Sequence, residues 1–237
     1  TPVKQVLVSG GAARGVLLEN GEKIEADDVV LNADFGYAAT RLFAPGVLRK
    51  YTAANLAKKK LSCSTFMLYL GVDTRYDLPH HTIVFANEYR KNVESVFHGK
   101  TLSPDVSFYV RNADINDPAL APPGCSALYV LVPVPNNRSG IDWAKERAPF
   151  RETVLDALEK RGGLPGLRGH IQAEICITPA DWESQYNVYE GATFNLAHNW
   201  GQMIYFRPHN NFAELDHCYL SGGGTHPASS LPTVYES

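Results

Sequence analysis

The sequence contains no long hydrophobic run and few cysteines. Nowhere do 18 apolar residues follow one another, so no membrane-spanning helix is predicted, and no charged-then-apolar leader marks a signal peptide. Three of the four cysteines, Cys63, Cys176 and Cys218, lie in apolar surroundings, which predicts buried thiols. All four, Cys125 included, are far apart and form no C-x-x-C pair, which points to a reducing compartment. We therefore interpret the glycosylation sequon at Asn137 as a chance match.

A strong charge of either sign is also missing. The net charge is −3, which leaves no electrostatic footprint for a nucleic acid. Lys58, Lys59 and Lys60 follow an alanine-rich stretch, and cations suit the carboxyl end of a helix. We interpret them as solvated residues at a helix end rather than as an anion-binding site. These features leave room for a protein that lies on a membrane surface.

The composition is that of a globular protein with one or two domains. The chain has 237 residues, of which 44% are hydrophobic and 20% charged. It opens without Met at Thr1 and stops at Ser237 where a helix pattern begins, so we expect a piece of a longer protein. Strand patterns come in clusters between helix patterns, which favours a mixed α/β (α+β) fold.

Turn and periodicity signals place the predicted elements. Ser9–Gly11 and Asn20–Gly21 predict hairpin turns, Val29–Leu31 a buried strand, and Asp34 a helix N-cap. Helices are also predicted from about 47 to 60, from 142 to 162, and from Pro179 to Ser184. Further strands are predicted at Thr65–Val72, Thr82–Ala86, Val106–Val110, Ala127–Val134, Ile171–Ile177 and Cys218–Leu220.

The most informative segment is a strand that runs into three glycines, Gly222, Gly223 and Gly224, followed by Thr225-His226-Pro227. Without a Cβ, a glycine backbone can approach a ligand closely, and the freed amides can hold a phosphate. A tight turn that needs positive φ explains the same glycines. Spacing alone leaves both interpretations open.

Extended to Val234, this segment closely resembles the carboxy-terminal flavin motif of the phytoene dehydrogenase (carotenoid desaturase) family. The family commonly has glycine where Ala228 and Ser230 stand here. Three other stretches match the family in the same order and together cover almost the whole chain. They are Gly15-Val16 with Asn20-Gly21 and Asn32-Ala33-Asp34, then Pro122 to Tyr129, and lastly Gly191 to His198 continuing through Gln202 to Asn210.

The resemblance implies a two-part, FAD-dependent enzyme. Residues 1–34 would belong to a Rossmann-like FAD-binding domain, 35–215 to a substrate domain with a mixed β-sheet and helices, and 216–237 to the FAD-binding domain again. The expected flavin contacts are Val3, Gly222, Gly223, Gly224, Thr225, His226, Pro227, Leu231 and Pro232. Val3 fits a plain core residue equally well. Since G-x-G-x-x-G after a first strand is absent, we expect this chain alone to bind FAD weakly or not at all.

The resemblance also implies an apolar polyene substrate, desaturated by hydride transfer to the flavin. Such a substrate is recognised by an apolar tunnel, which Phe66–Leu70 and Leu128–Val134 would line unless they are ordinary core strands. A polyene dissolved in lipid implies a cytoplasmic enzyme that associates peripherally with a membrane surface. No acid or base, no metal site and no oligomeric state can be assigned.

Two other functions share these features, namely an FAD-dependent carotenoid isomerase and a non-catalytic carotenoid-binding protein. Several motif matches lack their context: Asp34-Phe35-Gly36 has no kinase partner motifs, and His80-His81 has no further ligands at metal spacing. His198 and the segment Arg207–Asn210 are interpreted as polar anchors near the domain junction, with orientation of the flavin or the substrate as the alternative.

Overall fold

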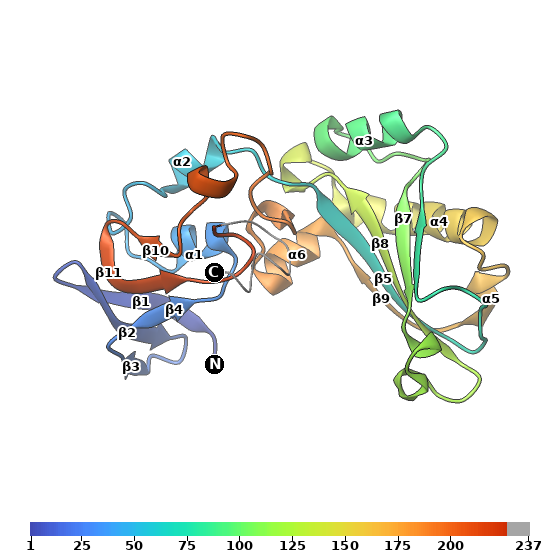
Figure 1. Ribbon diagram of the computed structural model, residues 1–237, viewed down its shortest axis with the longest axis horizontal. Helices are drawn as coiled ribbons and strands as arrows, with labels where there is room; N and C mark the ends of the chain where they lie inside the picture. Colours follow the sequence, from blue (N-terminus) through green and yellow to red (C-terminus); the bar gives the residue numbers. More distant parts are fainter. Residues whose placement is uncertain (227–237) are drawn as a thin grey trace. The chain divides into compact units, whose positions relative to one another are not determined.

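The computed structural model describes residues 1–226, which form two compact units (Figure 1). Unit 1 consists of residues 1–62 together with the described residues from 187 onward, and unit 2 of residues 63–186. Each unit has its own β-sheet and its own hydrophobic core. The predicted mixed α/β fold is confirmed.

Unit 1 begins with two antiparallel hairpins. They join β1 (Val3–Ser9) to β2 (Ala12–Leu18) and β2 to β3 (Lys23–Glu25). Both predicted turns are confirmed, and each contains glycine with φ between +60° and +87°, at Gly10, Gly11 and Gly21. Such turns match the right-handed twist of the strands that they connect.

The last strand of the chain returns to the sheet started by the first residues. β11 (Leu215–Leu220) pairs in parallel with β4 (Val29–Leu31), and also meets β2 in parallel where Asp216 lies opposite Ala12. The short β10 (Asn211–Phe212) pairs antiparallel with β11. In Figure 1, the blue amino-terminal strands and the red β11 lie side by side.

Two short helices pack on this sheet, α1 (Phe35–Arg41) and α2 (Ala53–Ala57). The helix predicted from 47 to 60 is only α2, because Thr52 caps it there by accepting the amide of Asn55 at 3.2 Å. The core of unit 1 includes side chains from α1, β4, β10 and β11: Phe35, Ala38, Ala39, Leu42, Val29, Leu31, Phe212, Cys218 and Leu220.

Unit 2 is built on a five-stranded sheet in the order β6-β7-β8-β5-β9, antiparallel throughout. The strands are β5 (Ser64–Val72), β6 (His81–Val84), β7 (Phe108–Asn112), β8 (Ser126–Val134) and β9 (Ile171–Ile177). All five were predicted within a few residues. The mixed sheet of the molecule is the one in unit 1.

The helices of unit 2 are α3 (Tyr89–His98), α4 (Trp143–Arg161), α5 (Leu167–His170) and α6 (Pro179–Tyr186). α4 and α5 cover one sheet face, where alternate strand residues pack on Trp143, Phe150 and Leu155. Pro149 lies inside α4 without ending it. The 3₁₀ turns described are Ala113–Ile115, Pro118–Leu120, Asn137–Ser139, Tyr189–Gly191 and Ile204–Phe206.

The boundaries between the two units differ from the domain boundaries that the family resemblance implies. Residues 35–62 and 187–215, expected in the substrate domain, fold together with the amino-terminal hairpins in unit 1. Their cores explain the difference, because α1 packs against β4 and β11. Which functional domain each unit represents stays a prediction.

Candidate functional site

Two parallel strands of unit 1 end side by side at the same edge of the sheet. Leu220 of β11 lies opposite Leu31 of β4, and the amide of Ser221 donates to the Leu31 carbonyl at 3.0 Å. Asn32 and the glycine segment leave the sheet at this edge, and α1 follows β4 directly. In sheets of this kind, ligands bind at the carboxyl ends of parallel strands.

The glycine segment forms a turn that we call the glycine turn, residues 221–226. Gly222 has a φ of +107°, and an added Cβ would lie 3.0 Å from Oδ1 of Asn32. The carbonyl of Gly222 accepts from the amide of Thr225 at 3.2 Å and from its hydroxyl at 2.9 Å. Within residues 1–226, no hydrogen bond uses the amides of Gly222, Gly223 or Gly224. Three neighbouring amide donors therefore have no partner among residues 1–226.

The carboxylate of Asp34 accepts hydrogen bonds from three residues close to the glycine turn. Its carboxylate accepts from the Tyr37 amide at 2.9 Å, which confirms the predicted helix cap, and from the Tyr189 amide at 3.2 Å. It also accepts from the side chain of Asn195 at 2.7 Å. Burial raises the pKa of Asp34, and these hydrogen bonds act in the opposite direction. One carboxylate thus joins α1 to residues 189–195, which are far apart in the sequence.

Asn195 in turn lies directly against Gly224. A Cβ built on Gly224 would be 2.9 Å from Nδ2 of Asn195 and 3.0 Å from Cβ of Phe35. The predicted family motifs at Asn32–Asp34, 191–198 and 222–226 therefore meet around one turn. Sequence order alone could not show that these motifs meet, because more than 150 residues separate Asp34 from its hydrogen-bond partner Tyr189.

Arg207 is the largest fully buried side chain of the described chain, only 1% exposed. Its guanidinium donates to the Leu196 carbonyl at 3.1 Å and to the Gly223 carbonyl at 3.2 Å. Nε has no hydrogen-bond partner, and no carboxylate of residues 1–226 forms an ion pair with Arg207. Burial lowers the pKa of Arg207. The residue predicted as a polar anchor is therefore a buried cation that donates a hydrogen bond to the glycine turn at Gly223.

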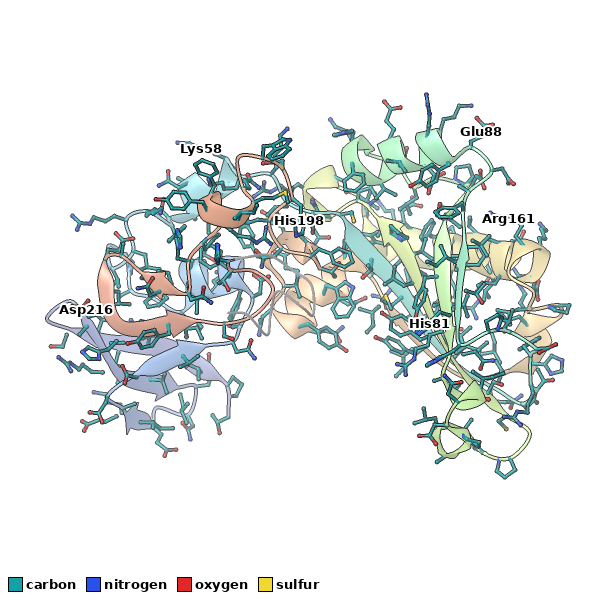
Figure 2. The ribbon with its side chains drawn as sticks, viewed as in Figure 1. Lys58, His81, Glu88, Arg161, His198 and Asp216 are labelled. Carbon is teal, nitrogen blue, oxygen red and sulfur yellow. The ribbon has the colours of Figure 1, made fainter. Side chains whose placement is uncertain are left out.

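Three histidines surround the same region. The amide of His226 donates to the Pro208 carbonyl at 2.7 Å, and its ring stacks on His209 with centroids 5.7 Å apart. His198, labelled in Figure 2, has a pKa lowered first by burial and then by the charge of Arg207. The imidazole of His198 is thus expected to be neutral near pH 7.

Of the remaining predicted flavin contacts, only Val3 lies within residues 1–226, and it forms no hydrogen bond or ring contact with the glycine turn. Val3 is half-buried at the start of β1, opposite Leu18. Because β2 runs parallel to β11, Val3 lies at the same end of the sheet as the glycine turn. Pro227, Leu231 and Pro232 lie outside the described residues.

Unit 2 has a sheet face opposite α4 that carries a row of apolar side chains across all five strands. By register, the row runs through Ile83, Tyr109, Leu131, Met67 and Ile177. Neighbouring strands are about 4.8 Å apart, so the row extends about 19 Å. Ile83 is 64% exposed at one end, whereas Met67 and Ile177 are buried at the end where α6 packs on β5 and β9.

A second row on this face brings aromatic rings together. Tyr69 and Tyr129 pair across β5 and β8 with ring centroids 5.3 Å apart, and Tyr129 lies 5.9 Å from Tyr109. Ile175 flanks Tyr69 on β9 and is 61% exposed. We call these two rows the open sheet face. Alternate residues of β5 and β8 belong to the core, which confirms the interpretation of these stretches as core strands, and the residues between them belong to this face. Lining of a polyene site stays a prediction.

Other chemistry is limited in the described part of the chain. Residues 1–226 contain no group of three His, Cys, Asp or Glu side chains placed to hold a metal ion. No helix within this range is long and apolar enough to cross a bilayer. The four cysteines are free thiols, and burial raises the pKa of Cys63, Cys176 and Cys218 to about 11, which keeps them protonated and unreactive at neutral pH.

Curated proteins resemble this chain along its full length. A 4,4'-diapophytoene desaturase (4,4'-diapolycopene-forming) of Methylomonas sp is 56% identical over 99% of the chain and 46% of its own length. An all-trans-zeta-carotene desaturase of Myxococcus xanthus is 44% identical over 100% of the chain and 45% of its own length. The lycopene-forming phytoene desaturase of Pseudescherichia vulneris is 35% identical over 99% and 48% respectively. The chain therefore spans about half the length of these relatives.

Similarity of structure points to the same fold. No protein-family model matches the chain. The crystal structure of an oxidoreductase from Methanosarcina mazei matches 98% of this chain and 46% of its own with a TM-score of 0.57 at 18% identity, which shows a common fold. The sequence identities and coverage bear out the resemblance read from the motifs, and the chain belongs to the phytoene and carotenoid desaturase family.

Proposed function

We propose that the complete protein containing this chain is an FAD-dependent carotenoid desaturase, in which unit 1 holds the flavin. The glycine turn carries this proposal. Three consecutive amides without hydrogen-bond partners in residues 1–226 lie at the carboxyl edge of the parallel pair β4 and β11. Amides in this position suit anionic or carbonyl oxygens such as those of a dinucleotide. FAD therefore fits the donors that this chain offers.

The surroundings of the glycine turn support the same assignment. Arg207 donates to the Gly223 carbonyl and Asn195 packs against Gly224, and neither uses the amides of the turn, which are left for a ligand. The nucleotide fingerprint G-x-G-x-x-G is missing from these residues. Binding then requires residues of the complete protein, and weak or no binding of FAD to this chain alone stays our expectation.

For the substrate, we propose an apolar polyene that lies on the open sheet face of unit 2. The accessible part of the row runs from Ile83 through Tyr109 to Leu131 over about 10 Å and offers mainly apolar side chains, whereas Met67 and Ile177 at the other end are buried. Recognition then rests on burial of the carbon chain, at about 0.8 kcal/mol for each CH₂ removed from water. The related desaturases are named for such polyenes, namely 4,4'-diapophytoene, zeta-carotene and phytoene.

The proposed reaction removes two hydrogens from adjacent carbons, one as a hydride and the other as a proton released to solvent, and leaves a double bond. A bound flavin supplies the hydride acceptor for an unactivated carbon chain. The residues of this chain orient the polyene, exclude water from it and hold the cofactor-binding turn in place. We further propose a cytoplasmic protein that associates with a membrane surface, because its substrate is dissolved in lipid.

Product analysis of the complete protein tests this proposal. We expect the purified protein to show flavin absorbance and to convert a phytoene-type polyene into products with two fewer hydrogens per step, measured by mass spectrometry. A product of unchanged mass would instead support an isomerase. A protein that shows no flavin absorbance after incubation with saturating FAD, but still binds the polyene, would support a carotenoid-binding protein. Either result contradicts the desaturase assignment.

A charge placed on the open sheet face tests the polyene site separately. Leu131→Glu puts a carboxylate between Tyr109 and Met67, where a polyene cannot solvate it. We expect kcat/KM for the polyene to fall at least about ten-fold, equivalent to about 1.4 kcal/mol, with flavin absorbance unchanged. Ala119→Glu, at an exposed position of the same unit, is the matched control. Equal activity of the two variants would place the polyene elsewhere.

A further inference from the structure

Exposed aromatic residues and lysines gather on one surface of unit 1. Trp200 is 92% exposed, Tyr205 73% and Phe206 66%, although side chains of this size are usually covered. Lys58 and Lys60 are exposed at the end of α2, and Lys59 between them is half-buried. We call these six residues the basic–aromatic surface. Figure 1 shows the orange-red turn that contains Tyr205 and Phe206 beside α2.

Part-buried hydrogen bonds join the loop that carries the aromatic residues to the segment that carries the lysines. Gln202 is buried, and its side chain accepts from the Lys60 amide at 2.9 Å and donates to the Lys60 carbonyl at 2.8 Å. A β-bridge between Leu61 and Leu196 continues the contact. These bonds fix the two segments to each other, so the lysines and the aromatic rings belong to one surface rather than to two independent loops.

The charge of these two segments is strongly one-sided. Residues 35–62 contain six cations and no carboxylate, namely Arg41, Arg49, Lys50, Lys58, Lys59 and Lys60. Residues 191–213 likewise contain no Asp or Glu. The complete chain has a net charge of −3, so its acidic residues lie in the other segments. A surface with this charge attracts anions and repels other cationic surfaces.

We propose that the basic–aromatic surface docks on a lipid bilayer with anionic headgroups. Trp and Tyr are the side chains that favour the boundary between headgroups and acyl chains, since one part of each ring system is apolar and another polar. Lysines beside them add attraction to anionic lipids. This inference deepens the proposed function, because it names the surface by which an enzyme with a lipid-dissolved substrate would reach the membrane.

Charge complementarity selects the bilayer over another part of the same protein. A covering protein segment would need carboxylates to match Lys58, Lys59 and Lys60, and it would remove Trp200 from water permanently. A headgroup layer supplies the anions and an apolar depth together. α2 ends at Ala57, which confirms the predicted helix end, and Lys58, labelled in Figure 2, is exposed. The proposal gives the three lysines an anionic partner in place of the solvated role that the sequence alone favours.

Vesicle co-sedimentation of the complete protein tests the proposal. We expect it to bind vesicles of phosphatidylcholine mixed with phosphatidylglycerol, and to bind phosphatidylcholine alone much more weakly. The double variant K58Q/K60Q should lower the association constant about 25-fold, or about five-fold for each lysine near the surface. The hydrogen bonds between Lys60 and Gln202 use the backbone of Lys60, so the substitutions do not remove them. Added salt should weaken binding of the wild type more than binding of the variant.

The control removes the same charge elsewhere in unit 1. Lys4 and Lys23 are exposed on the amino-terminal hairpins, so K4Q/K23Q should bind anionic vesicles like the wild type. A second arm replaces aromatic rings: W200S/F206S should lose the binding that persists at high salt. Equal losses for K58Q/K60Q and K4Q/K23Q would overturn the proposal, because binding would then follow net charge alone.

Two further measurements separate this proposal from the proposed function. Flavin absorbance and polyene conversion in detergent micelles report on the enzyme without a bilayer, and we expect both to be unchanged in K58Q/K60Q. A lower melting temperature of W200S/F206S with unchanged vesicle binding would show that another part of the protein covers the surface, and would overturn the proposal. A wild-type protein that binds neither kind of vesicle would also overturn the docking proposal, even if it desaturates the polyene.

Discussion

Replacing Gly224 by valine is expected to abolish tight binding of FAD to the complete protein. Even the Cβ of the new side chain would lie 2.9 Å from Asn195 Nδ2 and 3.0 Å from Cβ of Phe35. Asn195 cannot move aside freely, because its side chain donates to Asp34 at 2.7 Å. Phe35 is fixed at the start of α1. The glycine turn must therefore shift, and its free amides move with it.

The size of this effect follows from the cost of overpacking. Inserting methyl groups into a packed site costs about 1–3 kcal/mol, which corresponds to an increase in the Kd for FAD of about 5- to 150-fold. The measurement is titration of the FAD-free complete protein, followed by quenching of flavin fluorescence. Gly201→Val is the control, since a Cβ there meets only Asn199 Oδ1 at an ordinary 3.7 Å.

A milder variant keeps the test valid if Gly224→Val fails to fold. Gly222→Ala adds one methyl group 3.0 Å from Asn32 at a φ of +107°, where a side chain is strained. We expect weaker FAD binding with a far-ultraviolet circular dichroism spectrum like that of the wild type. Folded variants at both glycines that bind FAD as tightly as the wild type would remove the glycine turn from the flavin site.

Replacing Arg207 by methionine is expected to lower both the stability of the protein and its affinity for FAD. The substitution leaves the buried carbonyl of Leu196 and the part-buried carbonyl of Gly223 without this donor. Hydrogen bonds to a charged group contribute about 1.5–3 kcal/mol each, so two bonds amount to about 3–6 kcal/mol. Removing a buried cation without an ion-pair partner in residues 1–226 offsets part of this loss. We expect a net loss of about 2–4 kcal/mol in the free energy of unfolding.

Urea denaturation and FAD titration together assign the role of Arg207. Lysine should not rescue the variant, because a single ammonium group cannot reproduce the fork that spans two carbonyls. Arg41→Met removes an exposed arginine at the end of α1 and serves as the control. An Arg207→Met protein as stable as the wild type, with unchanged affinity for FAD, would show that the guanidinium does not position the glycine turn.

Much of the local structure could be predicted from short sequence patterns. Asn20-Gly21 and the Gly10-Gly11 pair specify tight hairpins, since both turns need positive φ. Asp34 caps α1 as predicted, because a side-chain oxygen at that position can accept an amide of the first turn. The apolar, β-branched run at Ala127–Val134 predicted a strand, and the structure shows that alternate residues of β8 are buried. α3 was not predicted, since its buried residues are only Asn92 and Val96.

The sequence by itself determined the hairpins, the strands, the glycine turn and the family, because each depends on residues close together in the chain or on ordered motifs. Only the tertiary structure decided which motifs meet. Asp34 reaches Tyr189 and Asn195, and Arg207 reaches Gly223, because parallel pairing of β4 with β11 joins the two ends of the chain in one sheet. Burial in the common core then selects these partners, which no local pattern encodes.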